Sequence, residues 1–170
     1  MEVLENQHCP FCSNNTLTLH EAEKDVPFFG VCYIFSMDCS NCNYHKADIE
    51  TEEKRNPIKT TLEISEEDDM KIRVIKSSNA TIKIPRIATV EPGEASNGYI
   101  TNVEGILSRI KRQIEIARDN SDDKAERNKA KNMVKKLQKV MWGQEKLSLT
   151  LEDPTGNSAI ISEKAVTKKL

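Results

Sequence analysis

Two Cys-x-x-Cys pairs constrain this chain more than any other feature of its sequence. They stand as Cys9-Pro-Phe-Cys12 and Cys39-Ser-Asn-Cys42, with twenty-six residues between them. The tight turn of such a pair directs two thiolates towards one point, and two pairs complete a tetrahedral Cys₄ site with no open position. The spacing therefore predicts that Cys9, Cys12, Cys39 and Cys42 hold one structural Zn²⁺ ion in an N-terminal zinc ribbon with a long hairpin.

Two other uses of these cysteines fit the sequence less well. A redox dithiol needs only one Cys-x-x-Cys pair, and a disulfide framework needs an oxidising compartment. The chain has five cysteines, an odd number, and we expect Cys32 to be a small buried hydrophobe because it lies in an apolar stretch. A Cys₄ site accepts iron as well as zinc, so the residues leave the choice between these metals open.

The beginning of the chain and its apolar runs bear on its location. The first ten residues lack the basic and apolar segments of a signal peptide. No apolar run approaches the ~20 residues that a membrane span requires. We therefore expect a cytoplasmic, reduced protein that does not use a membrane as a partner.

The net charge of −2 hides an uneven distribution of charges. The stretch from Asp48 to Asp69 is acidic, whereas Arg109 to Lys139 carries eleven basic residues against five acidic ones. Such runs are usually solvated surfaces, and the pI near 6.0 supports that interpretation. The alternative is that the basic stretch binds a partner, with nucleic acid as one possibility.

An aromatic stretch, VPFFGVCYIF at residues 26–35, leads into the second cysteine pair. We interpret it as a strand with a bend at Gly30. Two interpretations of Phe28 and Phe29 remain open. They could cover the small zinc module, which has little core of its own, or they could be exposed anchors for a partner, since aromatic residues are enriched in interface cores.

Alternating residues predict a β domain around a helical hairpin. Short apolar–polar alternations fill residues 60–91, and residues 146–152 repeat the pattern. Between them, helical periodicity predicts two antiparallel helices over about 101–142, with a Thr101–Glu104 capping box, a break at residues 119–121 and a stop at Gly143. We expect Trp142 to lock this hairpin to the sheet.

The last part of the chain contains a turn and a second extended run. The residues Asp153-Pro154-Thr155-Gly156-Asn157-Ser158 have the chemistry of a turn. Residues 159–161 then resume a strand, and residues 167–170 are expected to be frayed. Strands on both sides of the helices indicate one β domain with a helical insertion. The expected division is a zinc-ribbon module at 1–48 and a β domain at 49–170.

The ordered set CPFC, VPFFG, CSNCNYH, TIKIP, ITNVEGIL and EDPTGNS resembles the zinc-finger ZPR family. Eukaryotic members of that family carry two such modules and bind translation elongation factor 1-alpha, and this chain is similar to the single-module archaeal relatives. The resemblance implies a zinc ribbon followed by a double-stranded β-helix (jelly-roll-like) domain that carries the helical hairpin. It also implies a folding or assembly chaperone, or binding partner, of that elongation factor.

The resemblance also assigns roles to individual residues. The four cysteines of the two pairs match the zinc ligands of the family. The residues that match its aromatic motif and its late turn motif become candidate partner contacts: Phe28, Phe29, Gly30, Asp153, Pro154, Gly156 and Asn157. Two departures bear on the partner, namely Arg86 where the family usually has an acidic residue, and the altered loop GEASNG at residues 93–98.

The sequence favours binding over catalysis. It has no glycine-rich phosphate loop, no Cys/His or Ser/His constellation and no open zinc position, so we expect neither an enzyme nor a small-molecule substrate. The alternative to the protein-binding function is a nucleic-acid-binding zinc ribbon that uses the basic helical hairpin. Its affinity would fall steeply with salt, because phosphate contacts release counterions.

Overall fold

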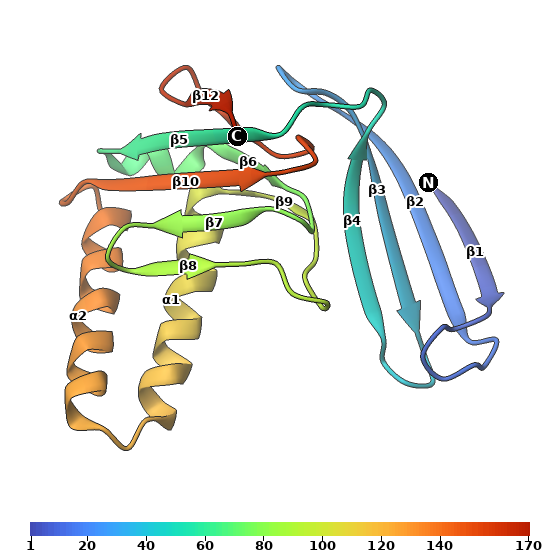
Figure 1. The fold of residues 1–170 in the computed structure, drawn as a ribbon, viewed down its shortest axis with the longest axis horizontal. Helices are drawn as coiled ribbons and strands as arrows, with labels where there is room; N and C mark the ends of the chain where they lie inside the picture. Colours follow the sequence, from blue (N-terminus) through green and yellow to red (C-terminus); the bar gives the residue numbers. More distant parts are fainter.

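The first four strands form an antiparallel sheet in the order β1-β2-β3-β4. The structure is a computed structural model that describes residues 1–170, and Figure 1 shows this sheet standing beside the rest of the chain. The strands are β1 (Glu2–Gln7), β2 (Leu17–Val26), β3 (Gly30–Cys39) and β4 (His45–Thr51). The predicted boundary between residues 48 and 49 stays a prediction, and β4 itself continues to Thr51.

The remaining strands form two further sheets, of order β12-β5-β10-β7-β8 and β11-β6-β9. Buried apolar residues alternate along β5 and β10, which pair over their full lengths. The strands are β5 (Ile58–Ile64), β6 (Arg73–Lys76), β7 (Thr81–Ile84), β8 (Ala88–Val90), β9 (Tyr99–Asn102), β10 (Leu147–Asp153), β11 (Ala159–Ile161) and β12 (Val166–Lys169). The prediction of a mainly β domain is confirmed.

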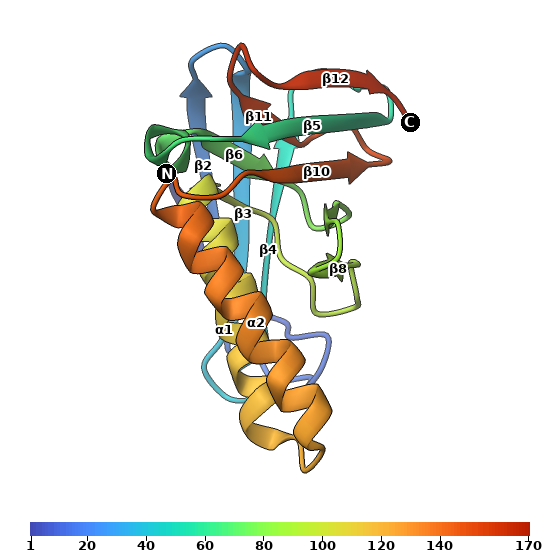
Figure 2. The same cartoon turned by 90° about the vertical axis from the view of Figure 1, so that its left-hand side faces the viewer.

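The helical hairpin is inserted between β9 and β10, as predicted. It consists of α1 (Val103–Asn120) and α2 (Lys124–Met141), and Figure 2 shows its far end projecting beyond the sheets. The near end is held because Ile106, Leu107 and Leu137 are fully buried in the main apolar core with the strands. Neither helix combines the length and the apolar character that a membrane-spanning helix needs.

The ends of the helices follow their capping residues. The predicted Thr101–Glu104 capping box is wrong, because β9 extends to Asn102 and the Asn102 side chain accepts the N–H of Gly105 at 2.8 Å. At the other end, Gly143 adopts a φ of +67° and completes a Schellman motif with Val140 and Lys139. The stop at Gly143 is therefore confirmed.

Three further expectations were wrong. Trp142 is 58% exposed and does not lock the hairpin to the sheet, because it caps α2 outside the buried face that Leu137 and Val140 form. Residues 166–169 are not frayed but form β12, which pairs with β5 and so satisfies its backbone. The β alternation expected over residues 60–91 is also interrupted by a 3₁₀ helix, η1 (Glu67–Lys71), which precedes β6.

The first sheet packs against the three-stranded sheet through a second apolar cluster. Val26, Cys32 and Ile49 lie there against Ile75 of β6, which confirms that Cys32 is a buried hydrophobe. The Asp48 carboxylate, in the middle of the edge strand β4, also accepts hydrogen bonds from the backbone N–H and the hydroxyl of Ser78. Apolar packing and partly buried polar contacts together join the two parts of the chain.

Candidate metal centre and aromatic turn

The four cysteines of the two pairs come together at one end of the first sheet. Their sulfurs lie within 4.8 Å of one another, and no histidine joins them. The Cys9–Cys42 and Cys12–Cys39 sulfur pairs are both 3.7 Å apart, far beyond the ~2.05 Å of a disulfide. A zinc–sulfur distance of about 2.3 Å gives a tetrahedron with edges of about 3.8 Å. The donor set and its spacing thus fit one Zn²⁺ ion.

The two cysteine turns share one backbone design. In each, the N–H of the first cysteine donates to the carbonyl five residues on, and the N–H four residues on donates back, at 2.9–3.0 Å. The residue after the second cysteine, Ser13 or Asn43, adopts a φ of 58° in both turns. The two pairs therefore present their sulfurs from equivalent turns, which explains how a spacing of twenty-six residues closes into one site.

The thiols of the cluster differ in acidity. The Thr16 hydroxyl, 3.3 Å from the Cys39 sulfur, and the Cys42 backbone N–H lower the pKa of Cys39 to about 6. The Tyr44 N–H acts to lower the pKa of Cys42, but desolvation and hydrogen bonds with the neighbouring thiols outweigh it and raise that pKa to about 12. Four close sulfurs resist joint deprotonation, and a bound divalent cation supplies the positive charge that allows it.

The aromatic residues lie at the opposite end of this sheet, where Pro27–Phe29 form the turn between β2 and β3 (Figure 1). The predicted continuous strand with a bend at Gly30 is therefore wrong, because β3 begins only at Gly30, after the turn. Strands of ten residues separate this turn from the cysteines by roughly 30 Å. Phe28 and Phe29 are consequently remote from the cysteines, but Phe29 packs against the cluster of Val26 and Cys32 and so covers that end of the first sheet.

The two phenylalanines of the turn play different parts. The side chain of Phe28 is 98% exposed, and its φ of 66° is unfavourable for a bulky residue. Phe29 is half-buried, with the Arg55 guanidinium 4.0 Å from its ring centroid and donating to its carbonyl at 2.7 Å. One aromatic ring therefore anchors the turn to the linker before β5, and the other projects into solvent.

A groove of about 500 Å³ lies beside this turn. Phe28 and Phe29 form one side, and the other side comes from β11, the turn that follows it and β12. The remaining lining residues are Ala159, Ile160, Ile161, Ser162, Glu163 and Thr167. The groove combines mostly apolar walls with an exposed aromatic side chain, Phe28, at its edge.

The late turn motif supports this region from the inside. Asp153 is fully buried, and its carboxylate accepts hydrogen bonds from the hydroxyls of Ser77, Thr155 and Ser158. Burial acts to raise the pKa of Asp153, but these hydrogen bonds outweigh it and hold the pKa below its ordinary value. Asp153, expected as a partner contact, thus organises the turn from within.

The other residues of the motif fasten the turn to the linker. Gly156 has a φ of +74°, and an added Cβ would lie 2.7 Å from the Cβ of Arg55. The Asn157 side chain accepts the Thr51 hydroxyl at 2.8 Å, and only Pro154 is exposed. The structure thus brings the late turn close to Arg55, the residue that holds Phe29.

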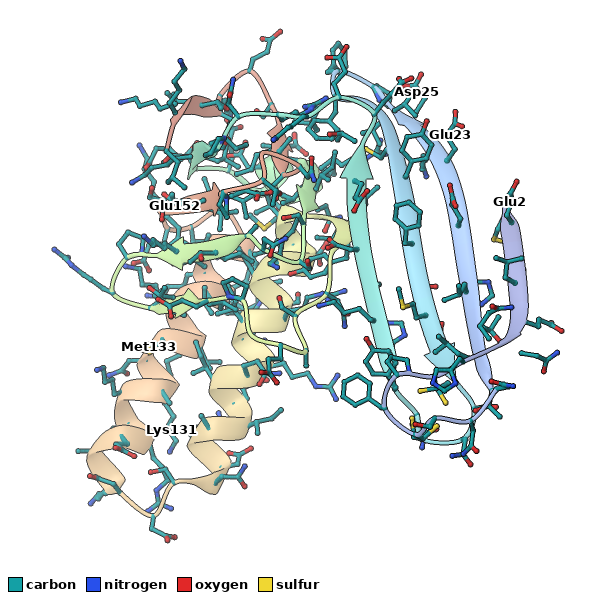
Figure 3. The ribbon with its side chains drawn as sticks, turned by 45° about the vertical axis from the view of Figure 1, so that its right-hand side comes forward. Glu2, Glu23, Asp25, Lys131, Met133 and Glu152 are labelled. Carbon is teal, nitrogen blue, oxygen red and sulfur yellow. The ribbon has the colours of Figure 1, made fainter.

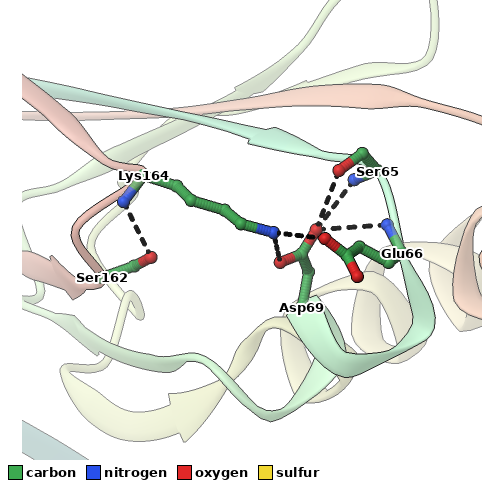
Figure 4. A network of polar contacts seen from close by, with 5 residues as sticks. All are labelled: Ser65, Glu66, Asp69, Ser162 and Lys164. Atoms are coloured by element: carbon green, nitrogen blue, oxygen red, sulfur yellow. Dashed lines mark hydrogen bonds and ion pairs between the residues drawn. The ribbon is translucent and has the colours of Figure 1, made fainter.

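An ion-pair network that the sequence analysis missed fixes the turn after β11. Figure 4 shows Lys164 donating to the carboxylates of Asp69 at 2.7 Å and Glu66 at 2.9 Å. The Asp69 side chain is 4% exposed and also accepts the N–H groups of Ser65 and Glu66. The Glu66–Asp69 capping box was a local signal for η1, but nothing in the sequence pairs Asp69 with a lysine 95 residues away.

The two departures from the family pattern lie away from the aromatic turn. Arg86 adopts a φ of 62° in the turn between β7 and β8. In the altered loop, the Gly98 N–H donates to the Ala47 carbonyl, and the Asn97 side chain accepts the Ala47 N–H. The loop therefore borders the free edge of β4.

Comparison with known proteins adds evidence of kinship. The model of the ZPR1 jelly-roll domain matches residues 68–169. A ZPR1-like protein of Methanocaldococcus jannaschii is 33% identical over 165 residues, covering 96% of this chain and 83% of its own. A ZPR1-like protein of Pyrococcus horikoshii is 32% identical, covering 95% and 75%. The zinc finger chaperone zpr1 of Schizosaccharomyces pombe is 27% identical over 139 residues, 79% of this chain and 30% of its own.

Proposed function

Because this chain belongs to the ZPR1 family of zinc finger proteins, we propose that it is a zinc-binding protein-interaction module that helps translation elongation factor 1-alpha, a GTPase, to fold or assemble. Eukaryotic relatives are named as zinc finger proteins, and one of them is named as a zinc finger chaperone. The observation that carries the proposal is Phe28, a large aromatic residue that is exposed and strained beside an apolar groove.

The aromatic turn has the physical features of a binding anchor. An unfavourable φ persists where the surrounding structure imposes it, and such strain clusters at functional sites. Burying one Phe side chain contributes about 1.5–3 kcal/mol. The groove between Phe28 and the β11 region can receive an apolar side chain of the partner. Anchor and pocket together would form the centre of an interface.

Zinc has a structural role in this proposal. Cys9, Cys12, Cys39 and Cys42 are its ligands, and a closed Cys₄ site leaves no position for a catalytic water. The ion fixes one end of the β1–β4 sheet, and the same strands carry the aromatic turn at the other end. A binding function without catalysis agrees with this arrangement.

Some of the remaining candidate contact residues lie on the surface, and the others hold that surface in place from below. Pro154 is exposed, and Gly30 closes the aromatic turn with a φ of 103°. Asp153 and Gly156 are buried and Asn157 contacts Thr51, so in the proposal they hold the surface in place. Their replacement would weaken binding through the shape of this region.

The test compares Phe28→Gly with the unchanged chain, each loaded with zinc. Binding to purified translation elongation factor 1-alpha is measured by calorimetry, and the refolding yield of the denatured factor is measured in parallel. Phe28→Gly should weaken binding by at least about tenfold, the loss of about 1.4 kcal/mol or more expected for an anchor. Its thermal stability should stay equal or rise, because glycine relieves the strained φ.

Phe11→Ala is the matched control. Phe11 is also an exposed aromatic residue, but it stacks on Tyr44 in the cysteine turns with ring centroids 4.4 Å apart. This variant should bind the factor normally. Equal binding by Phe28→Gly and the unchanged chain, or an equal loss with Phe11→Ala, would contradict the proposal.

The basic hairpin supports a second candidate, nucleic-acid binding. Of its eleven basic residues, only Arg118 and Lys136 form ion pairs with carboxylates. Unpaired lysines and arginines on a projecting hairpin can contact phosphates. The salt dependence of the affinity distinguishes the two candidates. For nucleic acid, six phosphate contacts would lower the affinity by about 10³-fold or more between 50 and 200 mM salt. Binding of a protein partner through the apolar contacts of Phe28 should change little over the same range of salt.

A further inference from the structure

The outer face of the first sheet has no partner within the chain. The inner face is the one that packs on the three-stranded sheet, through Val26, Cys32 and Ile49. Directly opposed residues lie on the same face of a sheet, so the strand register assigns the outer face. The opposed residues there are Leu4, Leu19, Met37 and Lys46, then Glu2, Glu21, Phe35 and Asp48, and then Glu23, Tyr33 and Glu50. Lys46 and Asp48, on the edge strand β4, contact Ser96 and Ser78 of the other part of the chain, so the free surface is that of β1 to β3.

Apolar side chains form a continuous band on this face, which we call the outer band: Leu4, Leu19, Tyr33, Phe35 and Met37. Leu4 and Met37 are exposed, and the other three are half-buried. A small groove of about 130 Å³ lies among four of them, with Glu2 and Glu21 also in its lining. The solvent-exposed face of an antiparallel sheet normally carries polar residues. The outer band is therefore more apolar than a face that only contacts water needs to be.

Carboxylates without an ion-pair partner lie beside the outer band, towards the end of the sheet that carries the aromatic turn. They are Glu2, Glu21, Glu23, Asp25 and Glu50, all exposed. None of them forms an ion pair. The one basic residue of the face, Lys46, instead donates to the carbonyls of Ser96 at 2.6 Å and Glu94 at 3.4 Å.

The electrostatics of the face agree with this arrangement. Figure 3 shows Glu2, Glu23 and Asp25 on the free side of the sheet. Desolvation raises the pKa of the Tyr33 hydroxyl, and Glu23, Glu52 and Glu21 raise it further. The outer band therefore lies in a negative field, because five carboxylates outnumber the single cation of the face, Lys46.

We propose that the outer face binds a cationic amphipathic segment of a protein partner. Its apolar side chains would cover the outer band, and its lysines and arginines would pair with the carboxylates beside it. The charge decides the occupant, since five unpaired carboxylates repel nucleic acid and acidic surfaces and select a positive one. The band crosses β1 to β3, two strand spacings or about 10 Å, which matches the width of one α-helix.

The probe is a fluorescein-labelled peptide of about 18 residues, long enough to form a helix, with Leu and Lys at helical spacing. Its binding to the zinc-loaded full chain is followed by fluorescence anisotropy at about 0.15 M salt. We expect saturable binding that Glu21→Lys/Glu23→Lys weakens at least about tenfold. Phe35→Ser should also weaken it, because it removes the centre of the outer band.

The matched control is Glu67→Lys/Asp122→Lys, which changes the net charge equally at two exposed positions outside this sheet. It should leave binding nearly unchanged. A second probe of equal charge, without leucines, should bind at least about tenfold more weakly. Circular dichroism and zinc content check that every variant is folded.

Three results would overturn the proposal. The first is the absence of saturable binding. The second is that Glu67→Lys/Asp122→Lys weakens binding as much as Glu21→Lys/Glu23→Lys, or that the leucine-free peptide binds as tightly as the first probe. Either form of the second result would show that the peptide adsorbs by charge alone. The third is a dimer of the chain in light scattering that Glu21→Lys/Glu23→Lys dissociates. In that case a second copy, through its basic hairpin, would occupy the face.

Discussion

Ser13, Phe28 and Asn43 share a left-handed backbone conformation, but for different reasons. Ser13 and Asn43 follow the cysteine pairs and shape the turns that present the sulfurs. Asn tolerates this conformation well and a small polar Ser is accommodated, whereas a bulky Phe is disfavoured. The first two therefore serve the backbone of the metal centre, and Phe28 is held in spite of its backbone, which is why it carries the functional proposal.

Asp153 provides a prediction at the scale of one residue. Replacing it by Asn should lower the free energy of unfolding by about 1–3 kcal/mol at pH 7, because the hydroxyls of Ser77, Thr155 and Ser158 lose a charged acceptor. The pKa of Asp153 is lowered in the folded chain. Its stabilisation is therefore complete above the ordinary value of 3.8 and is lost as the pH falls from there through the folded pKa.

Urea unfolding of the unchanged chain and of Asp153→Asn at several pH values checks this sign. The difference between them should be constant from pH 7 to about 4.5 and should shrink below pH 3.8. The exposed Asp122→Asn variant controls for a general effect of charge. A difference that persists unchanged at pH 3 would show that Asp153 acts by shape alone.

Among the elements, η1 and the turn after β11 are held together by charge. Lys164 is the only cation that pairs with Asp69, and the Asp69 side chain is 4% exposed. Burial acts to raise the pKa of Asp69, while Lys164 and the backbone N–H groups of Ser65 and Glu66 outweigh it and lower the pKa. The turn that Lys164 secures carries Ser162 and Glu163, which line the groove beside Phe28.

Lys164→Met should lower the free energy of unfolding by about 1–2 kcal/mol, because Asp69 stays buried without its counter-ion. The loss of stability is smaller than for a fully buried ion pair, because the Lys164 side chain is 46% exposed. The matched control is Lys71→Met, whose partner Asp68 is exposed, and it should change stability by less than about 0.5 kcal/mol. Guanidinium unfolding measures both, and equal effects would refute a special role for Lys164.

Helices and strands whose apolar residues recur at a regular spacing were predictable from the sequence. Those without such a regular spacing were not. The helical hairpin follows from its apolar periodicity, and β10 from its alternation. β1 is exposed along most of its length, so it lacks an alternating signal, and β9 has only four residues. β12 could not be inferred because its support is a pairing with β5, about 107 residues away in sequence.

At the scale of the whole molecule, the parts of the candidate site that depend on local sequence were predictable, and the parts that depend on long-range packing were not. Local spacing predicted the four cysteines, because each turn is set by six neighbouring residues. The groove could not be predicted, since it joins Phe28 to β11 across more than a hundred residues. The position of Phe28 relative to β11 depends on how the first sheet packs against the rest, and no periodicity encodes that packing.

The junction between the two parts fixes this relative position. Val26, Cys32 and Ile49 pack on Ile75 beside the partly buried hydrogen bonds of Asp48. Zinc at one end of the first sheet and the junction near the other leave the aromatic turn in a defined place. The whole molecule thus presents Phe28 next to a groove that belongs to the other part of the chain.

A site-specific photo-cross-link at position 28 tests the central claim most directly. Phe28 is replaced by p-benzoylphenylalanine, the zinc-loaded chain is irradiated in nuclease-treated extract of the source cells, and the adducts are identified by mass spectrometry. The account predicts an adduct with translation elongation factor 1-alpha that is absent when Phe11 is replaced instead. No adduct with that factor from position 28, or an equal yield from position 11, would contradict it.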